Sequence, residues 1–85
     1  MNLNEIQTQL ADIANSGDDT FGNFANQIQQ IVEQAKAGQM SNAEVTEIMA
    51  DVQRQLAILE DMSQLAFKEK LNTLITGIIF IASAV

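Results

Sequence analysis

The chain is 85 residues long, a size at which a single hydrophobic core is marginal and oligomerisation is a common source of extra stability. It contains no cysteine and no histidine, which excludes disulfides, thiolate metal sites and histidine acid–base chemistry. Its net charge of -7 leaves no basic face for the phosphates of a nucleic acid. We therefore expect a non-enzymatic protein with no cofactor, no bound metal and no nucleic-acid partner.

The polar residues are unusual in kind and in distribution. Asn and Gln together supply 17 residues, and all four cationic side chains lie at or after Lys36. Amides cost less to bury at a wet interface than charges do. This composition favours a subunit of an assembly. A general preference for Asn and Gln with no functional meaning explains it equally well.

The first segment, Leu3 to Asn15, has the apolar spacing of one short helix. Asn2 is a candidate cap with Glu5 as its capping-box partner, and Gly17 marks the end. The acidic, amphipathic start has no cationic flank and no apolar run, so we expect no signal peptide and synthesis in the cytoplasm. The apolar stripe consists of Leu3, Ile6, Leu10 and Ile13.

A second helix is predicted over Phe21 to Lys36, with an apolar stripe of its own. The preceding carboxylates of Asp18 and Asp19 suit the positive end of a helix. The same acidic turn lacks the spaced oxygen ligands and closing Glu of an EF-hand, so we interpret it as a cap and not as a calcium loop.

The clearest local signal lies around Ser41. Gly38 is placed to close the second helix, and Ser41 with Glu44 forms an S-x-x-E capping box. Met40 and Val45 occupy the positions of a hydrophobic staple. No glycine or proline interrupts the chain from Ser41 to Thr76, so the sequence predicts one long third helix whose apolar stripe continues at heptad-like steps.

The last fifteen residues, 71–85, contain no charged side chain, and after Ile75 the apolar residues surround the predicted helix. A helix that is apolar on every side is buried in protein or in lipid. We therefore divide the chain into an amphipathic helical region, 1–70, and an apolar C-terminal packing segment, 71–85. For 77–85 a strand is the alternative to a helix, because Gly77 is followed by four residues of strand-forming type.

Length and flanking charge favour protein over lipid around this segment. Fifteen helical residues span about 22 Å, less than the roughly 30 Å hydrocarbon layer. Extending the helix backwards would place Lys68, Glu69 and Lys70 in lipid at about 2.5 to 3.5 kcal/mol for each central charge. Two short helices cannot cover both halves of one long helix, so we expect the tail to pack against another chain. The predicted contact row is Phe67, Leu71, Leu74, Ile78, Ile81 and Val85.

No motif in the sequence carries chemistry. Glu44, Glu47 and Asp51 share one helix face, but without histidine, cysteine or a second oxygen cluster they indicate a solvated face. The methionines Met40, Met49 and Met62 stand at helical spacing and indicate core filler instead of an adaptable binding groove.

We therefore predict an all-α fold of two short helices and one long C-terminal helix, a helical bundle or coiled coil completed by homo-oligomerisation. The predicted function is a structural or assembly subunit whose partners are copies of itself or a larger protein particle. A short acidic chain without catalytic residues and with an apolar packing tail resembles the small helical structural proteins of tailed bacteriophages, which implies incorporation into a viral particle as a virion component. The alternative is a small membrane-associated protein, either tail-anchored or holin-like.

Overall fold

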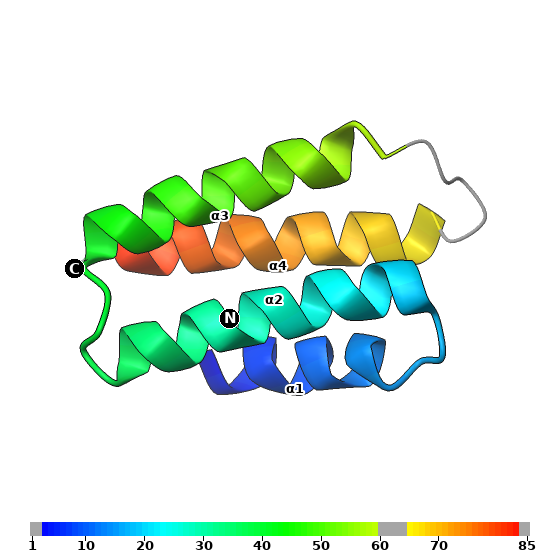
Figure 1. Ribbon diagram of the computed structural model, residues 1–85, viewed down its shortest axis with the longest axis horizontal. Helices are drawn as coiled ribbons and strands as arrows, with labels where there is room; N and C mark the ends of the chain where they lie inside the picture. Colours follow the sequence, from blue (N-terminus) through cyan, green and yellow to red (C-terminus); the bar gives the residue numbers. More distant parts are fainter. Residues whose placement is uncertain (1–2, 60–64, 84–85) are drawn as a thin grey trace.

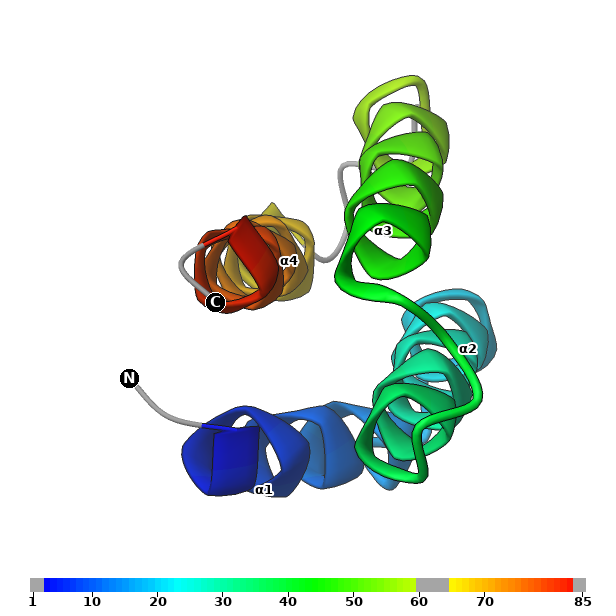
Figure 2. The same ribbon diagram turned by 90° about the vertical axis from the view of Figure 1, so that its left-hand side faces the viewer.

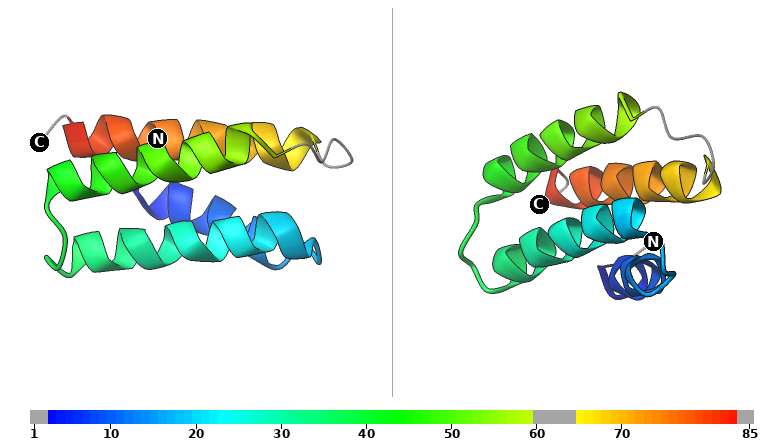
Figure 3. Two further views of the ribbon diagram at one scale, coloured as in Figure 1. Left: turned by 45° about the horizontal axis from the view of Figure 1, so that its top comes forward. Right: turned by 45° about the vertical axis from the view of Figure 1, so that its right-hand side comes forward.

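The computed structural model describes residues 3–59 and 65–83 of the chain and shows four α-helices in that part. They are α1 (Leu3–Ala14), α2 (Asp19–Lys36), α3 (Asn42–Ala57) and α4 (Leu65–Ser83). Figure 1 shows α2, α3 and α4 running nearly side by side along the long axis. Viewed from the end, α4 lies beside α3 and above α1, while α2 lies below α3 and beside α1 (Figure 2). The inclination of α1 to the other three helices is visible in Figure 3.

The two predicted N-terminal helices are present, with ends set by the turn residues that the sequence indicated. Gly17 has a φ of +90°, a conformation that glycine adopts without strain. Asp18 then caps α2, because its side-chain oxygen accepts a hydrogen bond from the Phe21 N–H at 2.9 Å. The proposed Asn2 cap of α1 lies outside the described residues. The turn from Asn15 to Asp18 therefore connects α1 to α2, and the two helices pack against each other.

The turn between α2 and α3 is also as predicted. Gly38 has a φ of +77°, and Ser41 and Glu44 form a complete capping box. In that box the Ser41 hydroxyl accepts from the Glu44 N–H at 3.1 Å, and a Glu44 carboxylate oxygen accepts from the Ser41 N–H at 3.1 Å. Two N–H groups at the start of α3 are satisfied in this way.

The predicted single long helix is wrong, because α3 ends at Ala57 and a separate helix, α4, begins at Leu65. The Ile58 N–H still bonds to the Arg54 carbonyl at 3.2 Å, but the chain then leaves the helical path. Lys68 reaches back from α4 and donates to the Leu59 carbonyl at 2.9 Å. A cation that satisfies the last carbonyls of a helix stabilises its end. This contact joins residues nine apart and cannot be seen as a local breaker in the sequence.

The expectation of a bundle completed by oligomerisation is also wrong. Because α4 folds back along α3, the apolar stripes of all four helices meet in one core within a single chain. The largest fully buried side chains come from every helix, and no polar side chain among the described residues is buried with them. The buried residues of α4 are Leu71, Leu74, Ile75, Ile78 and Ala82.

The C-terminal segment is helical through Ser83, so the strand alternative for 77–85 does not hold over its described residues. The domain boundary expected after Lys70 falls inside α4. Near the other end of α4, the rings of Phe67 and Phe21 pack with their centroids 6.3 Å apart. None of the helices in the described part of the chain is long and apolar enough to cross a membrane.

Candidate docking surface

The contact row predicted from the sequence lies mostly inside the bundle. Leu71 and Leu74 are completely buried and Ile78 is nearly so, while Phe67 and Ile81 are half-buried. Val85 lies outside the described residues. Burial of the row in its own bundle means that these side chains already have apolar partners within one chain.

Phe80 is the most exposed large apolar side chain in the described length of α4, with 73% of its surface in solvent. Residues three, four and seven positions apart lie on one side of a helix. Thr73, Thr76 and Ser83 stand at these spacings from Phe80 and are also exposed. We call this set the Phe80 face: Thr73, Thr76, Phe80 and Ser83.

The Phe80 face carries no charge, because α4 has no ionisable side chain after Lys70 in its described length. Its border with α3 is held by amide and hydroxyl groups. Gln53 on α3 donates to Asn72 Oδ1 at 2.9 Å and to Thr76 Oγ1 at 3.1 Å. The amide group of Gln53 therefore links α3 to two successive turns of α4, and it holds the Thr76 hydroxyl at the edge of the Phe80 face.

An apolar hollow of about 170 Å3 opens at the end of the bundle where α2 and α4 end and α3 begins. Its walls come from all four helices and are mainly aliphatic. Its two polar lining residues, Lys36 and Asn42, are exposed. We call this feature the end hollow, lined by Leu3, Val32, Ala35, Lys36, Asn42, Val45, Ile78, Ile81 and Ala82.

The Lys36 side of the end hollow is tied to α1. Lys36 Nζ donates to Gln7 Oε1 at 3.3 Å, and Gln29 Nε2 donates to the Gln7 carbonyl at 3.4 Å. Both contacts join α2 to α1, which supplies the hollow's Leu3 wall. Polar contacts thus position α1 at the rim, while the interior of the hollow stays apolar.

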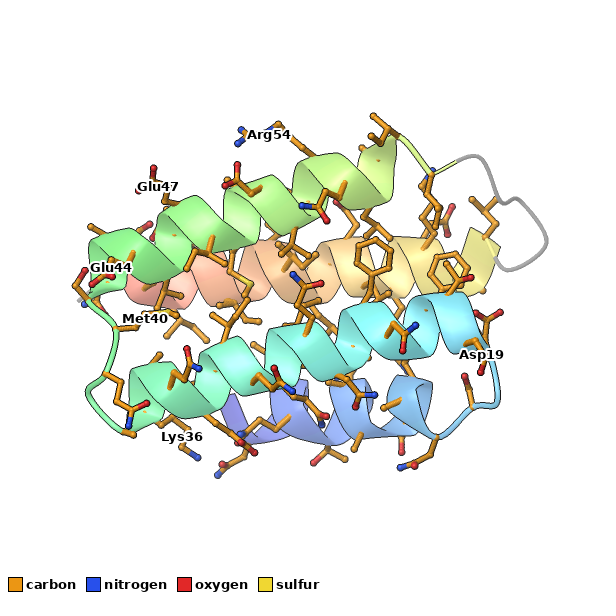
Figure 4. All side chains as sticks on the ribbon, viewed as in Figure 1. Asp19, Lys36, Met40, Glu44, Glu47 and Arg54 are labelled. Atoms are coloured by element: carbon orange, nitrogen blue, oxygen red, sulfur yellow. The ribbon has the colours of Figure 1, made fainter. Side chains whose placement is uncertain are left out.

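Charged side chains gather on a different surface, the outer edge of α3. Figure 4 shows Glu47 and Arg54 along this edge, pointing away from the other helices, and Glu44 at the start of α3. Arg54 pairs with Asp51. Hydrogen bonds from the Ser41 backbone N–H and hydroxyl hold the pKa of Glu44 below its ordinary value. In residues 3–59 and 65–83, no three acidic side chains gather closely enough to hold a metal ion. The capping box thus accounts for the lowered pKa of Glu44.

No protein-family model, curated protein or solved structure matches the chain. The sequence prediction missed Phe80 and the end hollow, because it followed the inner apolar stripe of the last helix. The available signal was Phe80 itself. It is an aromatic side chain on the side of the helix opposite that stripe, where its neighbours Thr73, Thr76 and Ser83 carry hydroxyl groups.

Proposed function

We propose that the chain is a non-enzymatic assembly subunit that associates with copies of itself through the Phe80 face. The single observation that carries this proposal is the 73% exposure of Phe80 at the centre of an uncharged helix face. Fully burying a phenylalanine side chain contributes about 1.5–3 kcal/mol, and the folded single chain leaves most of that contribution unused. A contact that covers Phe80 would gain it.

The charge distribution supports a second copy as the occupant of this face. Each copy carries a net charge of -7, so two copies repel one another wherever their acidic edges meet. The four residues of the Phe80 face carry no carboxylate, and Glu69, four residues before Thr73, is the first one met on that side of α4 going back along the helix. A second copy can therefore approach the Phe80 face with little like-charge repulsion, and the threonine and serine hydroxyls of the face can hydrogen-bond to it.

The resemblance to small helical structural proteins of tailed bacteriophages extends this proposal to a virion component. Such a role needs a folded module with a surface that recognises identical neighbours, and it needs no catalytic group. The compact bundle supplies the module, and the Phe80 face supplies the surface. In this proposal the oligomer forms from folded monomers, in contrast to helices that fold only when they meet.

Sedimentation velocity over a wide concentration range tests the proposal. We expect the wild-type chain to associate and Phe80→Ala to weaken association about tenfold or more, since 1.4 kcal/mol corresponds to one decade in Kd. Ile58→Ala is the matched control, because Ile58 is 78% exposed but lies at the end of α3 and should leave association unchanged. A monomeric wild-type chain, or equal losses in the two variants, would contradict the proposal. Co-sedimentation with lipid vesicles in place of self-association would favour the membrane-associated alternative.

A further inference from the structure

Two apolar features of the surface are left uncovered in the single chain, and one projects where the other is concave. Phe80 projects a phenyl ring into solvent, whereas the end hollow is a concave apolar site of about 170 Å3. A buried apolar cavity of about 150 Å3 is known to accommodate benzene in another protein, so the end hollow has the right size for one phenyl ring. Exposed apolar knobs and matching hollows on one molecule are a known route to self-assembly.

We infer that the end hollow of one copy is the socket for Phe80 of the next copy. This inference rests on the proposed function, because it names the partner surface for the Phe80 face. The socket is aliphatic where the ring would enter, with Val45, Ile78 and Ala82 among its walls. The hydrocarbon stem of Lys36 at the rim can cover the ring edge while its ammonium group stays in water.

The positions of knob and socket determine the symmetry of the contact. Ile78 and Ala82 line the end hollow, and each is two residues from Phe80, which is about 200° around the helix. Phe80 therefore points away from the hollow of its own chain. A two-fold dimer would need knob and socket on one face, so that each copy could reach the other. The contact is instead heterologous, with a different surface on each partner, and repeats into a ring or a filament.

Like-charge repulsion does not oppose this pairing at close range. The Phe80 face is uncharged, and the one charged residue lining the socket is the cation Lys36. Lys36 Nζ donates to the neutral amide oxygen of Gln7 at the rim, and this hydrogen bond does not neutralise the ammonium charge. A positive rim on a chain of net charge -7 attracts the acidic surface of the incoming copy.

Complementary variants test the inference. Phe80→Ala removes the knob and keeps the socket, whereas Ala35→Leu keeps the knob and fills the socket from α2. Each variant alone should stay monomeric at concentrations where the wild-type chain forms larger species. An equimolar mixture should form a heterodimer of twice the monomer mass and nothing larger, because neither end of that dimer can accept another copy. Sedimentation equilibrium measures these masses.

Two further variants serve as controls. Ala37→Leu adds the same side chain at an exposed position of the α2 end that does not line the hollow, and it should assemble like the wild-type chain. Ala82→Leu fills the socket from α4 and should behave like Ala35→Leu. Circular dichroism establishes that each variant is folded, and Ala82→Leu takes the place of Ala35→Leu in the mixture if that variant unfolds.

The outcomes separate this inference from the proposed function. If folded socket-filled variants assemble like the wild-type chain while Phe80→Ala does not, the proposed function stands and the socket assignment is overturned. A mixture that remains monomeric also overturns the assignment. If Phe80→Ala assembles like the wild-type chain, both the assignment and the proposed function fail.

Discussion

Apolar side chains on the two faces of α4 are buried to very different extents. On the inner face Leu71, Leu74 and Ile75 are completely buried among the other helices, whereas Phe80 on the outer face is 73% exposed. Burial of apolar surface stabilises whatever structure achieves it. The inner face therefore stabilises the monomer, and the outer face is free to stabilise a contact between monomers. The difference shows that an apolar segment can complete a fold and still leave a large apolar side chain in solvent.

The largest effect should come from removing both faces together. Truncation after Lys70 deletes all five buried residues of α4 and exposes the inner stripes of α1, α2 and α3. A single core of this size cannot lose one of four helices and keep its apolar surfaces covered. We expect loss of cooperative thermal unfolding, measured by circular dichroism. A truncated chain that unfolds cooperatively near the wild-type temperature would show that the core does not depend on α4.

Single truncations on the two faces should separate fold from assembly. Leu74→Ala should lower the free energy of unfolding by about 2–5 kcal/mol, because it removes a completely buried side chain and leaves a cavity. Phe80→Ala should change it by less than about 0.5 kcal/mol when the chain is monomeric, as exposed substitutions do. Urea unfolding at low protein concentration measures both values. Comparable losses of unfolding free energy in Leu74→Ala and Phe80→Ala would contradict the claim that the inner face alone stabilises the monomer.

A smaller loss should follow from the cap that begins α3, the helix packed along α4. Ser41→Ala removes the hydroxyl that accepts from the Glu44 N–H and should lower the free energy of unfolding by about 1 kcal/mol. Ser41→Asp restores an acceptor and should recover most of the loss. Neither variant should change self-association of the folded chain, since Ser41 belongs neither to the Phe80 face nor to the lining of the end hollow. A Ser41 variant that changes self-association but not the free energy of unfolding would contradict the separation between folding and assembly.

The smallest effect should be the pH dependence from Glu44. Its pKa is lower in the folded chain, so its contribution to stability is present at neutral pH and is lost as the pH falls through that lowered folded pKa. The loss follows from protonation of the carboxylate that accepts from the Ser41 backbone. The difference in unfolding free energy between wild type and Glu44→Gln should therefore shrink on acidification. A difference that stays constant or grows would contradict the capping-box cause of the pKa shift.

Much of the helix pattern could be predicted from local chemistry, because the deciding contacts are close in sequence. Gly17 and Gly38 close their helices with positive φ angles, and Ser41 with Glu44 begins α3 through a box of four residues. The break after Ala57 could not be predicted in this way. It has no glycine or proline, and the Lys68 contact that satisfies its carbonyls exists only after the chain has folded back.

That one missed turn also explains the errors about the site. A continuous helix would have left Leu71, Leu74 and Ile78 without partners, which is why they were predicted to contact another chain. Folding back buries them in the chain's own core and leaves Phe80, on the opposite side of α4, largely exposed. The end hollow could not be predicted either, because its walls combine residues from four helices whose relative positions the sequence does not specify.

The most direct test of the account is 19F NMR of the chain labelled throughout with 4-fluorophenylalanine. The four phenylalanines give four signals, and the Phe80→Ala variant identifies the signal of Phe80. We predict that dilution shifts the Phe80 signal towards its solvent-exposed position, while the signal of the completely buried Phe21 stays fixed. A Phe80 signal that does not change with concentration, or a Phe21 signal that shifts with it, would contradict the claim that a self-contained bundle assembles through Phe80.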